Sequence, residues 1–104
     1  MNRYILNEHG EPVPEPNLER WAEWFQTADR RVDRTDLPNG GFISTVFLGL
    51  DHSFKESGPP VVWETMVFDS NRKSQFMDRC SGSREQAEAM HQRMWFHFQR
   101  KEEA

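Results

Sequence analysis

Four ionisable residues that could support a reaction or hold a metal lie beside apolar segments of this chain: Asp51, His52, Glu64 and His91. Two imidazoles and a carboxylate would suit zinc, manganese or iron. A divalent ion bound by His52, His91 and Asp51 would activate water, with Glu64 as the base. The protein would then be a small metal-dependent hydrolase or nuclease. The spacing of the four residues in the sequence does not require them to lie close together in the fold. We therefore treat the metal-dependent enzyme as the alternative hypothesis.

The dipeptide Asp51-His52 also has a structural interpretation, which we favour. It follows the apolar run "ISTVFLGL" and precedes the loop-forming stretch "SFKESGPP". On a continuing strand the two side chains would point to opposite faces, so they could converge only if the chain turns there. We expect the polar end of a buried strand, with the Asp51 carboxylate ordering the loop.

Glu64 and His91 lie at positions where their neighbours are apolar. Glu64 alternates with Val62 and Met66, and an unpaired buried carboxylate is costly. It should therefore be exposed, protonated or paired, and Arg79 on the next expected strand is a candidate partner. His91 lies on the apolar stripe of the last expected helix, which predicts a hydrogen-bonded core histidine.

The sequence contains no phosphate loop, GxSxG, HExxH, paired CxxC or EF-hand motif. We therefore predict no catalytic residue, no cofactor and no metal site outside the alternative hypothesis. Exposed aromatic side chains could instead contact a partner, together with the ionisable residues above. The candidate binding residues are Trp21, Trp24, Trp63, Asp51, His52, Glu64 and His91.

Composition restricts the protein's class. The 17 acidic and 13 basic residues give a net charge of -4, which argues against nucleic-acid binding because phosphate neutralisation dominates that affinity. Cys80 is the only cysteine, which excludes an internal disulfide and fits a reducing compartment. No apolar run approaches the ~20 residues that span a membrane, and no signal-peptide pattern is present. We expect a cytoplasmic protein without membrane contact.

The N-terminal part should form a short strand at 4–6, a Pro-rich turn and connector over 7–17, and a helix over 18–29 capped by Asn17. Another helix should begin after Ser83, where Gln86 completes a capping box. It should fray over 100–104.

Between the helices the pattern predicts strands at 42–50, 61–68 and 75–80. Residues 31–36 could be the tail of the first helix or an exposed strand, and we favour the strand because Asn39-Gly40 is a good hairpin turn. The 104 residues should form a single α+β domain: an antiparallel meander of about four strands, with one helix before it and a C-terminal helix packed on the sheet. The central strands are apolar on both faces. Either the two helices cover opposite faces, or one face meets a partner, including a second copy in a homodimer.

Four segments of the chain resemble a family of small hypothetical proteins of tailed bacteriophages and prophages. The segments are "YILNEHGEPVPEPNLERWAEWFQTADRRV", "STVFLGLDHSF", "PPVVWETMVF" and "REQAEAMH". The resemblance runs from Tyr4 to about Met94, and it implies a phage-encoded protein acting in the host bacterial cytoplasm. It supplies no catalytic residues. The chain departs from the family pattern at 69–74, where "DSNRKS" replaces a more glycine-rich turn.

These observations predict an accessory protein that is a non-catalytic binding module for a host or phage protein. The absence of a catalytic motif, the two apolar faces of the sheet and the phage resemblance all favour this function over the metal-dependent alternative.

Overall fold

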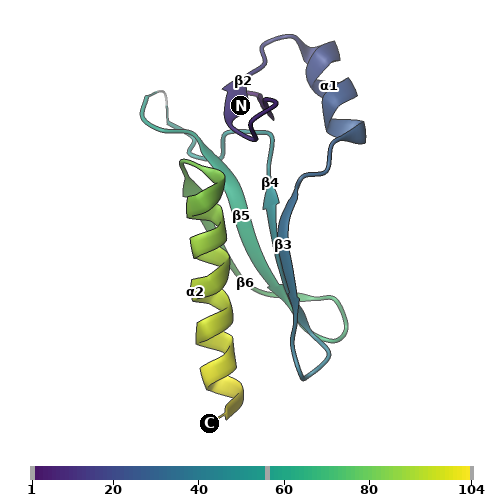
Figure 1. Cartoon of the computed structure of the whole chain (residues 1–104), viewed down its shortest axis with the longest axis vertical. Helices are drawn as coiled ribbons and strands as arrows, with labels where there is room; N and C mark the ends of the chain where they lie inside the picture. Colours follow the sequence, from purple (N-terminus) through teal and green to yellow (C-terminus); the bar gives the residue numbers. More distant parts are fainter. Residues whose placement is uncertain (1, 56, 104) are drawn as a thin grey trace.

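A computed structural model of the chain describes residues 2–55 and 57–103, with backbone only for 100–103. The described part is α+β, as predicted (Figure 1). In chain order its elements are β1 (Tyr4–Leu6), β2 (Pro12–Pro14), α1 (Leu18–Thr27), β3 (Arg31–Asp36), β4 (Phe42–Phe47), β5 (Val61–Phe68), β6 (Ser74–Ser81) and α2 (Arg84–Glu103).

The four predicted strands form one antiparallel sheet in the order β3-β4-β5-β6. The hairpin between β3 and β4 turns at Asn39-Gly40, where Gly40 has φ of 90° and the Asn39 side chain accepts the N–H of Gly41. A positive φ strains other residues, so glycine suits this position. The meander of sequential strands is thus confirmed.

Strand β4 ends at Phe47, earlier than the predicted end at residue 50. Gly49 adopts φ of 75°, and a Cβ there would lie 3.2 Å from the Phe25 ring. Trp21 donates its indole N–H to the Gly49 carbonyl at 3.0 Å. Helix α1 therefore packs directly on this backbone, and the contact interrupts the strand in a way that hydrophobic periodicity does not reveal.

Helix α2 covers one face of the sheet and contacts all four of its strands (Figure 1). Its predicted capping box is present: the Gln86 side chain accepts the N–H of Ser83 at 2.8 Å. Residues 100–103 of the segment predicted to fray continue α2 as helical backbone, and residue 104 lies outside the described residues. Within the described residues, neither helix is long and apolar enough to cross a membrane.

Helix α1 lies beyond the end of the sheet, beside the β1-β2 hairpin (Figure 1). Asn17 caps it as predicted, accepting the N–H of Arg20 at 3.0 Å, and the helix ends at Thr27 because Ala28 is extended. The predicted segment 7–17 contains a turn and strand β2, which pairs with β1. Since α1 is at the sheet's end, neither described helix covers the second face.

Candidate functional site

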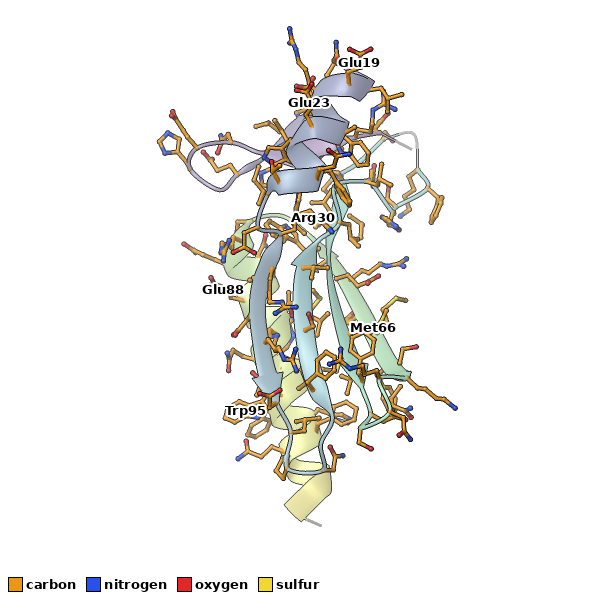
Figure 2. The ribbon with its side chains drawn as sticks, turned by 90° about the vertical axis from the view of Figure 1, so that its right-hand side faces the viewer. Glu19, Glu23, Arg30, Met66, Glu88 and Trp95 are labelled. Atoms are coloured by element: carbon orange, nitrogen blue, oxygen red, sulfur yellow. The ribbon has the colours of Figure 1, made fainter. Side chains whose placement is uncertain are left out.

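The uncovered face of the four-stranded sheet is the candidate functional site, and we call it the open face. Cross-strand pairing assigns its members, because directly opposed residues project to the same side. Figure 2 views this face, with α2 behind the sheet and Met66 in front. Its residues include Arg31, Arg34, Asp36, Phe42, Ser44, Val46, Glu64, Met66, Phe68, Met77 and Arg79.

The centre of the open face is apolar. Met66 lies opposite Met77 in the register of β5 and β6, and opposite Ser44 in that of β4. Met66 and Val46 are half-buried, whereas Met77 is 50% exposed. Methionine side chains are flexible and polarisable, so they adapt to differently shaped partners. The centre can therefore contact another apolar surface without rearranging the backbone.

Two phenylalanine rings and two guanidinium groups form a cluster at one end of the open face. Phe42 stacks on Phe68 with ring centroids 4.8 Å apart. The guanidinium carbon of Arg34 lies 4.1 Å from the centroid of Phe42, and that of Arg72 lies 5.9 Å from it. Asp36 pairs with Arg34 at 3.1 Å. Cation–π contacts hold these arginines beside the aromatic surface, where they can meet an acidic partner.

Glu64 forms the ion pair that we predicted. Arg79 donates from Nε to the Glu64 carboxylate at 2.8 Å across β5 and β6, and both side chains are partly buried. The pair explains how a carboxylate is accommodated beside Val46 and Met66. It also means that Glu64 is held by a cation and is not placed as a base.

We expect Arg79→Ala to lower the free energy of unfolding by about 1–3 kcal/mol, because it leaves the partly buried Glu64 carboxylate without its partner. The double variant Glu64→Gln/Arg79→Ala should recover part of this loss. Urea unfolding of the single and double variants measures the coupling. Strictly additive effects would show that the pair contributes nothing.

Asp51 orders the loop after β4, as predicted. Its carboxylate accepts the N–H groups of Ser53 at 2.9 Å and Val61 at 3.0 Å, so it joins the two ends of the loop. Desolvation alone would raise the pKa of Asp51, but these N–H donors bring that pKa below its ordinary value of 3.8. His52 turns away, and its Nδ1 bonds the Leu50 carbonyl at 2.9 Å.

His91 is a hydrogen-bonded core histidine, as predicted, with 0% exposure. Its Nδ1 lies 2.7 Å from the Thr45 hydroxyl, and its Nε2 lies 2.9 Å from the Thr35 hydroxyl. Thr45 continues the chain to Thr65 at 2.6 Å. Asp33 lies 3.7 Å from Nε2. A threonine, histidine and carboxylate thus meet in a line, but Thr45 is fully buried, so no substrate reaches its hydroxyl.

The structure does not bring together the residues of the proposed metal site. Glu64 projects from the open face, whereas His91 projects from α2 against the opposite face of the sheet. Among the described residues, no three His, Cys, Asp or Glu side chains are grouped in a way that could hold a metal ion. The hypothesis based on His52, His91 and Asp51 has no geometric support in the described chain.

The three tryptophans named as binding candidates are used for packing. Trp63 is 0% exposed and donates its indole N–H to Gly82 at 2.8 Å. Trp24 packs edge-on against Phe47, and Trp21 joins α1 to Gly49. Trp63 therefore cannot contact a partner in this conformation.

Sequence reasoning gave little weight to the residues that do form the open face, above all Met66, Phe68 and Met77. The available signal was the second apolar face of adjacent strands, at positions 42, 46, 66 and 68. In comparisons with known proteins, no protein-family model, curated protein or solved structure matches this chain.

Proposed function

We propose that this chain is a small phage-encoded accessory protein, a non-catalytic module that binds a host or phage protein in the bacterial cytoplasm. The observation that carries the binding function is the open face: one side of the sheet is covered by α2, and the other is apolar at its centre and uncovered by either described helix. The phage and host assignment rests on the sequence resemblance.

The composition of the open face supports a protein partner. Antiparallel sheets that face water on one side normally alternate apolar inward and polar outward residues. Here Phe42, Met66, Phe68 and Met77 project outward. Charged side chains surround them, and methionine, aromatic residues and arginine are the types enriched in protein interfaces. An apolar centre with a charged rim matches the anatomy of such an interface.

The contacts of Glu64, His91 and His52 do not favour a metal-dependent hydrolase or nuclease. Glu64 is paired with Arg79, His91 bonds Thr35 and Thr45, and His52 bonds a backbone carbonyl. Each side chain already has a structural partner.

Met77→Lys tests the proposal, because it places a charge at the apolar centre while changing a side chain that is 50% exposed. Tagged wild-type and variant proteins would be used to capture partners from infected and uninfected host lysate, read by quantitative mass spectrometry. We expect the variant to reduce capture of the wild-type partner by about tenfold or more, since burying an unpaired charge costs over a kcal/mol.

Leu18→Lys is the matched control. Leu18 is 59% exposed on α1 and the same charge is introduced there, away from the open face. It should leave capture unchanged. Capture insensitive to Met77→Lys would exclude the open face as the contact, and the lack of any partner in both lysates would contradict the binding function.

A further inference from the structure

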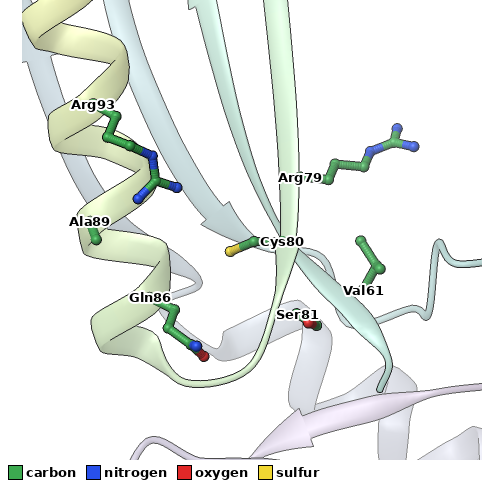
Figure 3. Close-up of a pocket in the computed structure, with 7 residues that line it drawn as sticks. All are labelled: Val61, Arg79, Cys80, Ser81, Gln86, Ala89 and Arg93. Atoms are coloured by element: carbon green, nitrogen blue, oxygen red, sulfur yellow. The ribbon is translucent and has the colours of Figure 1, made fainter. Parts of the chain in front are cut away.

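A cavity of about 450 Å³ lies at the edge of the sheet, between β6 and α2. Cys80 and Ser81 line it from the strand, and Gln86, Ala89 and Arg93 line it from the helix (Figure 3). We call it the edge groove. The edge groove differs from the open face because α2 forms one of its walls, whereas α2 does not cover the open face.

The backbone of β6 borders this groove. β6 is the last strand of the sheet and meets β5 only, so its outer edge meets no other strand of the described chain. An edge of eight residues is a template for another strand. The carboxylate of Asp78 accepts the backbone N–H of Arg79 at 2.8 Å. This bond between neighbouring residues satisfies the N–H group, and the carbonyl of an added strand can replace it.

The opposite edge of the sheet is protected. Four of the six residues of β3 are charged, and its pairing with β4 is interrupted by a register shift between Arg31 and Asp33. Arg84 also donates to the Val32 carbonyl at 3.5 Å. Charges and bulges are the usual means of blocking strand addition. The pairing of β6 with β5 also has register shifts, so the two edges differ in charge and length and not in regularity. Strand β6 has eight residues, of which two are charged, and it borders the edge groove.

In the described part of the chain, the charged residues that line the edge groove are Arg79 and Arg93. The Asp78 carboxylate lies close enough to act on Cys80 together with Arg93. Arg79 points away from the groove toward Glu64, whereas the Arg93 guanidinium extends from α2 toward Cys80 (Figure 3). The ion pairs among the described residues do not include Arg93. A carboxylate arriving on a neighbouring strand would form a charge-assisted bond with it.

We propose that the edge groove binds an extended peptide segment that adds to β6 as a fifth strand and places an Asp or Glu side chain against Arg93. Main-chain hydrogen bonds to β6 supply affinity, and the carboxylate pocket supplies selectivity. The edge groove and the open face are different surfaces, although β6 contributes residues to both.

A second copy of the chain fits the groove less well. If two copies of β6 pair antiparallel about a two-fold axis, directly opposed residues project to the same face of the sheet. Asp78 and Arg79 are neighbours in the strand and project to opposite faces, so Asp78 of one copy never lies opposite Arg79 of the other. The register that sets a second Asp78 opposite Cys80, near Arg93, also sets the two Arg79 residues opposite each other. Self-pairing therefore cannot satisfy Arg93 without a like-charge contact.

Selection of a display library of short random peptides against the full chain tests this proposal. We expect enriched peptides with alternating β-branched or aromatic residues and one acidic residue. Synthetic versions should lose about tenfold or more in affinity with Arg93→Glu by fluorescence anisotropy, through charge reversal. In an extended peptide, successive backbone N–H groups point to opposite edges, and only one edge of the added strand faces β6. N-methylation of every second amide should therefore abolish binding for one of the two alternating sets of amides and not for the other.

Arg20→Glu, the same charge reversal on α1, is the matched control and should leave affinity unchanged. Binding should also survive Ser44→Lys, a substitution on the open face in β4, which is separated from β6 by β5. Failure to enrich peptides, a lack of acidic residues in those enriched, or binding insensitive to Arg93→Glu would each overturn the proposal. So would a dimer in sedimentation equilibrium that Arg93→Glu dissociates.

Discussion

Trp63→Ala should lower the free energy of unfolding by about 3–5 kcal/mol. This is a large share of the total free energy of unfolding of a folded domain, which is typically about 5–15 kcal/mol. Trp63 is 0% exposed and packs edge-to-face on Phe47 with centroids 5.0 Å apart. It also contacts the core cluster that includes Ala87 and Met90 of α2. Truncation would leave a cavity between β5 and α2, and the Gly82 carbonyl would lose its indole donor.

Urea unfolding followed by circular dichroism measures this effect, and we expect the midpoint to fall by more than about 1 M. Phe54→Ala is the control. Phe54 is 74% exposed in the loop after β4, so its truncation should change the free energy of unfolding by less than about 0.5 kcal/mol. Equal effects of the two substitutions would contradict the packing of Trp63 in the core.

His91→Ala should cost about 2–4 kcal/mol, because it opens a cavity beneath α2 and leaves the buried Thr45 hydroxyl with one partner fewer. It should also change how stability depends on pH. Burial lowers the pKa of His91 below its ordinary value of 6.5, and the charge of Asp33 on β3 opposes part of that shift. The other groups in hydrogen-bond contact with the ring are the uncharged Thr35 and Thr45.

The direction of the pH effect follows from the lowered pKa. Between the folded pKa and 6.5 the unfolded chain binds more protons at this site than the folded chain does, so protonation favours unfolding. The contribution of His91 to stability is full above 6.5 and is lost as pH falls through the folded pKa. Urea unfolding at about pH 7.5 and about pH 5.5 should show a smaller decrease in His91→Ala than in the wild type.

His97→Gln serves as the comparison, because His97 is exposed on the same helix. It should retain the wild-type pH dependence. If His91→Ala keeps the full decrease, another group is responsible for it.

Much of the local structure was predictable because short-range chemistry determines it. The Asn39-Gly40 turn, the Asn17 cap and the capping box of Ser83 and Gln86 each involve residues close together in sequence. The pairing of Glu64 with Arg79 was also predictable, since a half-buried carboxylate on one strand needs a cation on the next.

The length of β4 and the role of the prolines were not predictable in this way. Gly49 ends the strand because Trp21 and Phe25 pack on it from α1, a contact between residues distant in sequence. Strand β2 pairs with β1 even though Pro12 and Pro14 lack N–H groups, which suits a short edge strand.

The sequence by itself determined the α+β class, the order of the strands and the structural roles of Asp51, Glu64 and His91. Only the tertiary structure decided that α1 lies beyond the sheet's end and leaves the open face uncovered, and that Arg93 faces the edge of β6. Periodicity shows which residues share a face of one element. Which element covers that face depends on packing between distant segments, and the single sequence carries no local signal for it.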